Sequence, residues 1–424
     1  MKLSPYPEYK DSGVEWIGDI PEGWETHRFK INFKYIKGRI PENLQEESNE
    51  NSLPYLSMDY LRGKSEVLYS DNDPKAIKIN DGDLLLLWDG SNAGEFVEGK
   101  KGYLSSTMVK LSLENIDLKY SNYLCRAFEP LLRDLTIGMG IPHVNGDNLG
   151  NIRITHPNIK EQKSIVSFLD KKTSEIDKII EKDTRLIELL QEKRTALINH
   201  VVTKGLDPEA PMKDSGIEWI GEIPEEWESR RIRTLSLVRR GASPRPIDDP
   251  KYFDVNGEYS WVRISDVTAS NKYLNKTSEK LSALGKSLSV PLEPGVLFIS
   301  IAASVGKPII SNIKCCIHDG FIYFQNLEVN QEYLFYIFIG GQAFQGLGKL
   351  GTQLNLNTET IAGITIPVPT KDEQRQIAQY IDKETQKIDL TINKIQNNIT
   401  LLQEYKKSII HHVVTGKVDV RDVV

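Results

Sequence analysis

The chain has 424 residues, of which 39% are hydrophobic and 26% are charged, and this balance is typical of a soluble globular protein with two or three domains. Its formal net charge is -6, which excludes a chain that is basic throughout, so any contact with nucleic acid has to come from local clusters of cations. The apolar runs near residues 84–88 and 333–339 are too short to span a bilayer. The first residues are polar and include an acid, unlike a secretory signal. We therefore expect a cytoplasmic protein that does not contact a membrane.

A segment with two tryptophans, which we name the strap, opens each half of the chain. Residues 10–25 read KDSGVEWIGDIPEGWE, and residues 213–228 repeat them as KDSGIEWIGEIPEEWE. Proline interrupts helices, and indole rings are large apolar anchors. We expect each strap to be a looped segment packed on a neighbouring surface, with a structural role and no chemistry.

Lysine and arginine gather directly after each strap. Residues 27–39 include five of these cations and no acid, and residues 229–247 include six arginines and no acid. Arginine suits bidentate contact with phosphate or guanine. Matching clusters in an acidic chain predict two phosphate-facing surfaces. The alternative for any one of these residues is a solvated strand face.

A region of mixed strands and helices follows each cluster. Apolar runs predict strands in the first half at residues 53–61, 83–88 and 106–113, and in the second half at 259–267, 295–301, 307–317 and 320–327. A helix and a last strand then follow at residues 121–135 and 151–155 in the first half, and at 331–344 and 363–367 in the second. Both regions therefore share one α/β layout, although their sequences diverge more than the straps do.

Small polar residues fill the loops beside these strands. The loops are residues 89–94 and 140–145 in the first half and residues 303–307 and 351–355 in the second. Asparagine, glutamine, histidine and lysine at loop tips suit contacts with base edges or phosphates. Turns are rich in small polar residues for other reasons, so these loops alone are weak signals.

Each half ends in a long segment with heptad spacing of apolar residues. It runs from Glu161 to about Val202 and again from Glu373 to about Val414, without proline or glycine, and residue n matches residue n+212. Helices of this length, about 60 Å at 1.5 Å per residue, need an equally long partner to cover the apolar seam. The seam residues that we expect to pack are Ile165, Leu169, Ile176, Leu190, Leu197, Ile377, Ile381, Ile388, Leu402 and Ile409.

We expect these two helices to form an intramolecular coiled coil. The alternative is a pair of ordinary core helices, but those are usually much shorter. Asp183 and Asn398 fall within the seam, where polar residues fix the register at some cost in stability. The predicted architecture therefore consists of a strap, an α/β region and a long helix, and this order is repeated in the second half of the chain.

Motifs for catalysis and metal binding are missing from the sequence. The residues 346–349 lack the spacing of a phosphate-binding loop, and there is no NPPY-like or DPPY-like segment for amino-group methylation and no HExxH. The three cysteines, Cys125, Cys315 and Cys316, form no CxxC or zinc pattern. We therefore expect a binding protein with no catalytic residues, no metal and no cofactor. The alternatives are a coiled-coil scaffold without DNA contact and a self-contained DNA methyltransferase or nuclease.

Several of these segments together resemble the specificity (S) subunit of type I restriction–modification enzymes. The likeness is carried by the strap YKDSGVEWIGDIPEGWE and its repeat, by GDLLLLWDGSNAG and PGVLFISIAASVGK, and by NLNTETIAGITIPVPTKDEQRQIAQYID with the helix ending HHVVTG. It covers essentially the whole chain. It implies an α+β fold with two pseudo-symmetric mixed α/β target recognition domains, separated by two long helices that form an antiparallel coiled coil.

The resemblance also implies a role without catalysis. Each recognition domain would read one half of a bipartite site in double-stranded DNA. The paired helices would set the spacer length and dock two methyltransferase (M) subunits, and restriction/translocase (R) subunits would join through the complex. The expected boundaries are 1–158 for recognition domain 1 with its strap, 159–203 for spacer helix 1, 204–228 for the linker and repeated strap, 229–370 for recognition domain 2, and 371–424 for spacer helix 2 and the tail.

The residues expected to contact DNA come from the basic clusters and the polar loops. They are Lys34, Lys37, Arg39, Asn92 and His143 in the first half and Arg239, Arg240, Arg245, Arg263, Lys307, Gln353 and Asn355 in the second. The loop at residues 140–145 does not match its counterpart at 352–357 closely. The sequence therefore leaves open which of these residues touch bases and which touch phosphates.

Overall fold

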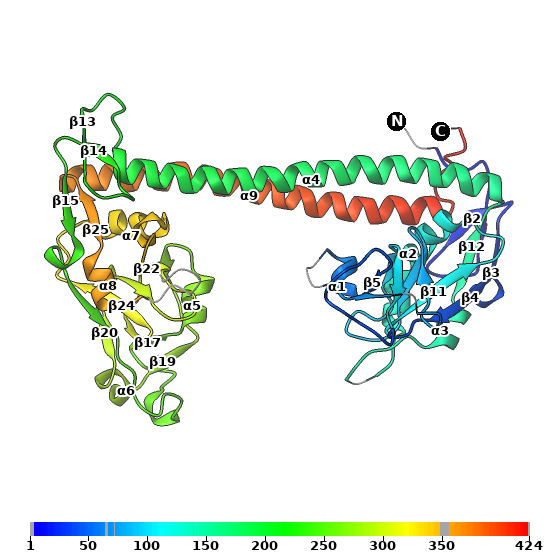
Figure 1. Cartoon of the computed structure of the whole chain (residues 1–424), viewed down its shortest axis with the longest axis horizontal. Coiled ribbons are helices and arrows are strands. Elements are labelled where there is room, and N and C mark those ends of the chain that lie inside the picture. Colours follow the sequence, from blue (N-terminus) through cyan, green and yellow to red (C-terminus); the bar gives the residue numbers. More distant parts are fainter. Residues whose placement is uncertain (1–3, 64–66, 72, 139, 348–355, 423–424) are drawn as a thin grey trace. The chain divides into compact units, whose positions relative to one another are not determined.

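A computed structural model of the chain describes residues 4–63, 67–71, 73–138, 140–347 and 356–422 (Figure 1). Backbone contacts divide the chain into unit 1, Met1–Thr184 with Gln396–Val424, and unit 2, Arg185–Ile395. The two long helices are α4 (Ile159–Lys204) and α9 (Lys371–Val414). Each unit therefore holds the start of one long helix and the end of the other.

Both straps are hairpins anchored by a buried tryptophan. In unit 1 the strap hairpin pairs β1 (Tyr9–Asp11) with β2 (Asp19–Pro21), and the next strand, β3 (Glu25–Arg28), pairs with β12 (Arg153–His156). In unit 2 the hairpin pairs β13 (Met212–Asp214) with β14 (Glu222–Pro224), and β15 (Glu228–Arg231) pairs with β25 (Thr365–Val368). The indole N–H of Trp24 donates to Glu161 at 3.3 Å, and that of Trp227 donates to Glu373 at 3.0 Å. Each strap is thus fixed to the first turn of a long helix.

Unit 1 contains two four-stranded sheets. The first has the order β4 (Phe33–Lys37), β11 (Met108–Leu113), β8 (Leu84–Leu87), β9 (Phe96–Glu98). The second has the order β6 (Tyr69–Ser70), β5 (Leu53–Leu56), β10 (Gly102–Leu104), β7 (Lys78–Ile79). The helices are α1 (Met58–Leu61), α2 (Leu118–Asp134) and α3 (Gly146–Asn151), with a 3-10 turn at Phe29–Ile31.

The apolar run in β8 is buried on both of its faces. Leu84 and Leu86 pack in the main core of unit 1 with Phe128 of α2, while Leu85 and Leu87 pack in a separate cluster that includes Leu56 of the second sheet. Successive side chains of a strand point to opposite faces. A strand between two apolar layers therefore reads as a continuous apolar run instead of an alternating one.

Unit 2 contains a five-stranded and a four-stranded sheet. The first has the order β16 (Leu237–Arg240), β24 (Phe321–Gln325), β21 (Leu297–Ser300), β22 (Pro308–Ser311), β18 (Tyr273–Leu274). The second has the order β19 (Glu279–Leu281), β17 (Tyr259–Val262), β23 (Cys315–Ile317), β20 (Val290–Leu292). The helices are α5 (Ile264–Ala269), α6 (Ala283–Ser287), α7 (Gln331–Ile339) and α8 (Thr358–Gly363), with 3-10 turns at Ile232–Thr234, Pro250–Tyr252 and Gln342–Phe344.

Two predicted strands end earlier than their apolar runs suggested. The run at residues 53–61 becomes helix α1 after Ser57, whose hydroxyl accepts from a backbone N–H of the first turn at 3.1 Å. The run at 259–267 becomes helix α5 after Arg263, whose own N–H donates to the carboxylate of Asp266 at 2.8 Å. These capping contacts start a helix where the apolar pattern alone predicts a strand.

Helices α4 and α9 run antiparallel where they meet within unit 1. Lys406 Nζ lies 2.6 Å from Asp177 Oδ1, and Asn398 Nδ2 lies 2.7 Å from Asp183 Oδ2, so residue numbers fall along α9 as they rise along α4. None of the described helices is long and apolar enough to cross a membrane.

The expected seam residues are buried most deeply near the helix ends. Ile165, Leu169, Ile176, Ile377, Ile381, Ile388 and Ile409 are buried, and Leu190, Leu197 and Leu402 are half-buried. Ile179, Leu186 and Tyr405 have the same spacing but are 44%, 43% and 52% exposed. The ends of the helices join the cores of the units, whereas a contact between only two helices leaves part of the apolar stripe open to solvent.

Candidate nucleic-acid interface

The two basic clusters lie on equivalent edge strands. Strand β4 is at the edge of its sheet in unit 1, and β16 is at the edge of its sheet in unit 2. In β4, Lys37 is opposite Val109, and in β16 the matching Arg240 is opposite Ile322. Cations at an edge also prevent unwanted pairing with other strands, so their position alone does not assign them to DNA.

In unit 1 the structure brings three predicted segments together. Lys37 Nζ lies 3.0 Å from the carboxylate of Asp89, in the loop that carries Asn92. Asp89 forms a β-bridge with His143, and the N–H of Gly90 donates to the carbonyl of Pro142 at 3.0 Å. The end of β4, the loop at 89–94 and the loop at 140–145 therefore form one surface.

Lys34 and Arg39 take no part in this contact. Lys34 is 73% exposed and pairs with Glu114. Arg39 is exposed and has no ion pair among the residues that the structure describes. An exposed ion pair contributes little to stability, so both side chains are available to an outside anion.

An aromatic ladder includes two residues of β4, and the sequence reading missed it. The rings of Phe33 and Tyr35 are stacked with centroids 6.0 Å apart, and those of Tyr35 and Trp88 are stacked at 5.0 Å. Tyr35 is 48% exposed and its neighbour Ile36 is 54% exposed. The spacing of two residues between Phe33 and Tyr35 in a strand was the signal, because it places both rings on one face.

In unit 2 the arginines gather around Asp319. Arg245 Nη2 lies 3.0 Å from its Oδ2, the Ser243 hydroxyl donates to its Oδ1 at 2.5 Å, and Arg240 Nε donates to its backbone carbonyl at 2.5 Å. The hydrogen bond from Ser243, and then the charges of Arg245 and Arg240, lower the pKa of Asp319. Asp319 thus orients two of the predicted arginines, Arg245 through its carboxylate and Arg240 through its backbone carbonyl, and nothing in the spacing of the sequence pointed to it.

The other predicted residues of unit 2 differ in availability. Arg239 is exposed and has no ion pair within the described part of the chain. Arg263 is bonded to Glu279 and lies 3.5 Å from Asp248, so its guanidinium is held within the protein. Gln353 and Asn355 lie outside the described residues.

Lys307 is half-buried and bonded inside unit 2. Its Nζ donates to the backbone carbonyl of Thr268 at 2.9 Å. Burial lowers the pKa of Lys307. Lys307 therefore fixes its loop to α5 more than it presents a free charge.

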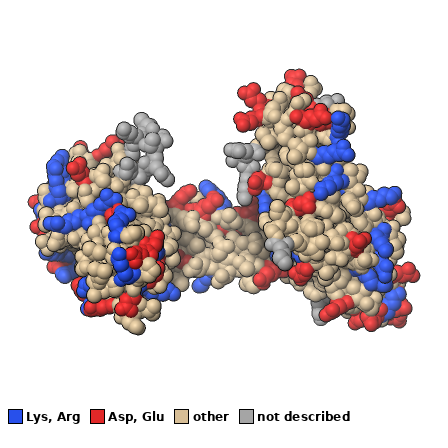
Figure 2. Space-filling model, turned by 90° about the horizontal axis from the view of Figure 1, so that it is seen from below, with Lys and Arg blue, Asp and Glu red and all other residues tan. Residues whose placement is uncertain are grey.

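Charges of both signs are interspersed on the surface. Figure 2 shows Lys and Arg side chains in several groups on each unit, with Asp and Glu side chains among them. Among the described residues, no three His, Cys, Asp or Glu side chains are close enough to hold a metal ion.

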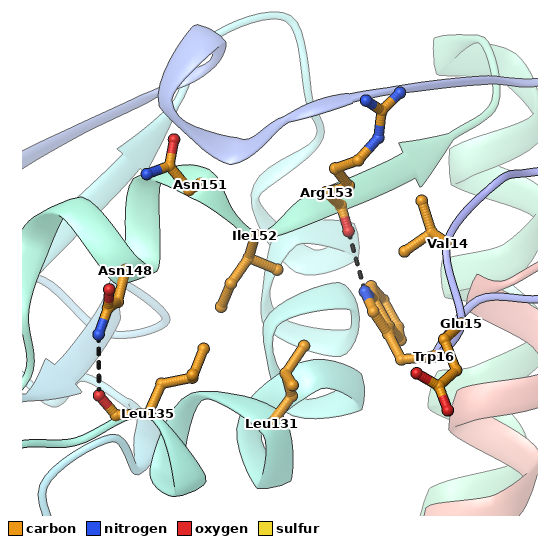
Figure 3. Close-up of a pocket in the computed structure, with 9 residues that line it drawn as sticks. All are labelled: Val14, Glu15, Trp16, Leu131, Leu135, Asn148, Asn151, Ile152 and Arg153. Carbon is orange, nitrogen blue, oxygen red and sulfur yellow. Dashed lines mark hydrogen bonds between the residues drawn. The ribbon is translucent and has the colours of Figure 1, made fainter.

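A shallow hollow of about 590 Å³ lies in unit 1 beside the strap (Figure 3). Its walls combine apolar side chains, among them Trp16, Leu131 and Ile152, with polar and charged ones such as Asn148 and Glu15. The indole N–H of Trp16 donates to the carbonyl of Arg153 at 3.0 Å, and this bond crosses one side of the hollow. The hollow lies between packed elements of the strap and α2, and the residues predicted to contact DNA are not among those that line it.

The chain is similar to known proteins along nearly its whole length. A family model described as type I restriction modification DNA specificity domain matches residues 21–190 and again 224–401. The type I restriction enzyme MjaVIII specificity subunit of Methanocaldococcus jannaschii is 32% identical over an alignment of 428 residues, which covers 95% of each chain. The putative type I restriction enzyme MjaX specificity subunit of the same organism is 25% identical, with 96% of each chain covered.

Two solved structures share the fold. A chain from a type I R-M system, studied for its complex assembly and conformational transition, superposes with a TM-score of 0.71 at 16% identity and covers 94% of this chain and 99% of that chain. The HsdS subunit from Thermoanaerobacter tengcongensis gives a TM-score of 0.51 at 16% identity and covers 94% and 98%. Because the family model matches both halves and a relative is 32% identical over nearly the full length, the chain belongs to the type I restriction–modification specificity subunits, with one DNA specificity domain in each half and a recognition role in place of a catalytic one.

Proposed function

We propose that this specificity subunit reads a bipartite site in double-stranded DNA, with unit 1 contacting one half-site and unit 2 the other. The observation that carries this proposal is the pair of equivalent edge strands, β4 and β16, which present cations at the same sheet register. The domains around these strands differ in sequence. Two surfaces that bind DNA phosphates in the same way, but carry different side chains beside them, suit two different half-sites.

Free and weakly paired cations are the proposed phosphate contacts. Arg39 and Arg239 have no ion pair among the described residues, and Lys34 is paired only at an exposed position. Neutralising a phosphate with such a side chain releases a counterion and makes binding dependent on salt. Lys37 and Arg245 would exchange a carboxylate partner for a phosphate on binding.

The proposed base contacts come from the edge strands and from the loops beside them. In unit 1 they are Tyr35 of β4 with the loop residues Asn92 and His143. In unit 2 they are Arg240 of β16 and the loop at residues 303–307. We assign Arg263 and Lys307 to holding loops in place, because both are bonded within unit 2. Gln353 and Asn355 stay in the proposal as predicted from the sequence.

We further propose that α4 and α9 form an antiparallel coiled coil that sets the gap between the half-sites. The 46 residues of α4 extend for about 70 Å at 1.5 Å per residue, which is about two turns of B-DNA. The boundaries proposed are those expected from the sequence, with recognition domains at 1–158 and 229–370 and spacer helices at 159–203 and 371–424.

Exposed apolar residues on the long helices are the proposed docking sites for two methyltransferase subunits, with restriction subunits joining through the complex. They are Ile179, Leu186, Leu189, Leu390, Leu401 and Tyr405, which are between 43% and 62% exposed. Exposed apolar side chains that recur along one element are typical of protein contacts.

A methyl-transfer assay tests the proposal against the two alternatives. The chain and its complex with methyltransferase subunits are each given DNA and S-adenosylmethionine, and the modified sites are sequenced. We expect methylation of a split motif by the complex and no turnover by the chain alone. Turnover by the chain alone would favour a self-contained methyltransferase, and an unchanged motif after exchange of the chain for another specificity subunit would favour a scaffold.

A further inference from the structure

In each unit, an aspartate at the same position of the long helix binds side chains of the packed domain. Asp170 of α4 and Asp382 of α9 match at the 212-residue offset. In unit 1, Asp170 accepts from the Nζ of Lys119 at 2.8 Å and from the hydroxyl of Tyr123 at 2.8 Å. Lys119 lies in the first turn of α2 and is 70% exposed.

In unit 2 the position of Lys119 carries an acid instead. Tyr120 and Tyr123 of α2 match Tyr333 and Tyr336 of α7, so Lys119 corresponds to Glu332. Glu332 and Asp382 would then be two like charges at the same contact between helices. Like charges this close disfavour each other, so the contact requires a cation from elsewhere.

Lys272 supplies that cation. Its Nζ lies 2.7 and 2.8 Å from the two carboxylate oxygens of Asp382 and 3.5 Å from Glu332. It stands 4.9 Å from the ring centroid of Tyr336, whose hydroxyl also donates to Asp382. Its side chain is only 13% exposed, so the ammonium group is enclosed by two carboxylates and aromatic rings.

Lys272 lies beside the main sheet of unit 2 and not in α7 or α9. It directly precedes β18, a strand that adds to the main sheet beside β22, and its carbonyl accepts from the N–H of Ile310 at 3.0 Å. Four residues before it, Thr268 bonds to Lys307 Nζ at 2.9 Å and to the Ser304 hydroxyl at 3.0 Å. Lys272, Lys307 and Asp382 also line one hollow of about 940 Å³ within unit 2.

We propose that Lys272 is a positioning residue, which ties the loop at residues 303–307 to helix α9 and so fixes how unit 2 presents that loop. In the described part of unit 1, the cation that binds Asp170 comes from α2 itself, and no outer loop is attached in this way. The assignment of the loop to DNA rests on the proposed function. The tie itself does not.

Two variants distinguish a role of Lys272 in positioning the loop from a role in only neutralising Glu332 and Asp382. Lys272→Met removes the cation and leaves Glu332 and Asp382 unbalanced. Adding Glu332→Lys to it recreates the arrangement of unit 1, where the cation comes from the helix. Lys119→Met is the matched control in unit 1.

The readouts are the melting temperature of the full chain in complex with its methyltransferase subunits, and its affinity for DNA carrying changes in one half-site at a time. We expect Lys272→Met to lower the melting temperature and to weaken discrimination at one half-site by about tenfold, the order of losing one well-placed contact. This is the half-site at which Arg240→Ala also weakens discrimination, because Arg240 is a base contact proposed for unit 2. The double variant should regain the melting temperature but not the discrimination. If it regains both, or if Lys272→Met leaves discrimination unchanged, the positioning role is wrong.

Hydrogen exchange keeps this inference separate from the proposed function. A wild-type complex without specific DNA affinity would overturn the proposed function. In that case, hydrogen exchange at residues 303–307 still tests whether Lys272 holds this loop. The N–H of Gly306 donates to the carbonyl of Ser300 at 2.8 Å, and it should exchange faster in both variants that lack Lys272. Unchanged exchange would overturn the tie.

Discussion

Gln162 and Gln374 make the same pair of hydrogen bonds at the start of the two long helices. The side-chain oxygen of Gln162 accepts from the backbone N–H of Asp117 at 2.8 Å, and its amide donates to the carbonyl of the proline five residues earlier at 2.8 Å. Gln374 does the same, with the N–H of Asn330 at 2.7 Å and its own preceding proline at 2.8 Å. Asp117 and Asn330 are the N-caps of α2 and α7. Each glutamine therefore joins a long helix to the packed helix of its unit.

Replacing Gln374 by leucine tests this joint. Gln374 is 1% exposed, so the variant leaves the buried carbonyl of Pro369 and the half-buried N–H of Asn330 without this partner, which costs about 2 kcal/mol. We expect the midpoint of urea unfolding to fall accordingly. Gln403→Leu, at an exposed position of the same helix, is the control. Equal midpoints for the two variants would contradict a structural role for Gln374.

Arg239→Ala tests the proposed phosphate contacts. Removing one such contact should weaken binding to all DNA sequences alike and reduce the slope of log affinity against log salt by about one. Affinity is measured on specific and random DNA over a range of salt concentrations. Arg185→Ala, on α4 and paired with Glu188, is the control. If Arg239→Ala leaves the salt slope unchanged, Arg239 of β16 does not contact a DNA phosphate.

Ile36→Arg is the converse experiment in unit 1. Ile36 matches Arg239 at the 203-residue offset and is 54% exposed. If β4 faces phosphates as β16 does, the added arginine should increase the salt slope by about one. Leu118→Arg, also at an exposed site but in α2 and outside the proposed interface, shows whether any added cation has the same effect. Equal increases in the two variants would indicate nonspecific attraction.

The stability of the chain should fall at low pH, in part because of His27. Burial, and then the neighbouring His156, lower the pKa of His27, while Glu25 acts in the opposite sense. Its Nε2 is buried without a partner among the described residues. Because the unfolded chain binds a proton more readily than the folded one, stability falls as the pH drops below the unfolded value of about 6.5.

Unfolding at pH 7 and pH 5 checks this prediction. We expect His27→Gln to reduce the loss of stability between the two pH values. Burial also lowers the pKa of His318 and His411, so part of the loss should remain. A loss as large as that of the wild type would show that His27 is not a source of the pH dependence.

The elements that the sequence predicted well are those with a local, repeated signal. The heptad spacing of Ile165, Leu169 and Ile381 predicted long helices, and the apolar run in β8 predicted a strand. The contacts that orient the candidate site are tertiary, and no spacing rule reports them. Asp319 gathers arginines that precede it by 74 to 79 residues, and Lys272 meets Asp382 across 110 residues.

The helix pair predicted from heptads also shows where sequence periodicity stops being informative. Ile179 and Tyr405 fit the same spacing as Ile176 but are exposed. Periodicity gives the direction in which a side chain points, not how much of the surface in that direction is covered. The exposed positions are the part of the apolar stripe that a contact between only two helices leaves uncovered.

The most direct test of the account changes the length of the helix pair. Seven residues, one heptad, are inserted beside Asp183 in α4 and beside its partner Asn398 in α9, and the DNA sites methylated by the complex are sequenced. We expect the same two half-sites with the gap between them lengthened by about three base pairs, because a heptad adds about 10 Å of helix and one base pair about 3.4 Å of DNA. Altered bases within a half-site, or an undivided motif for the wild type, would contradict the account.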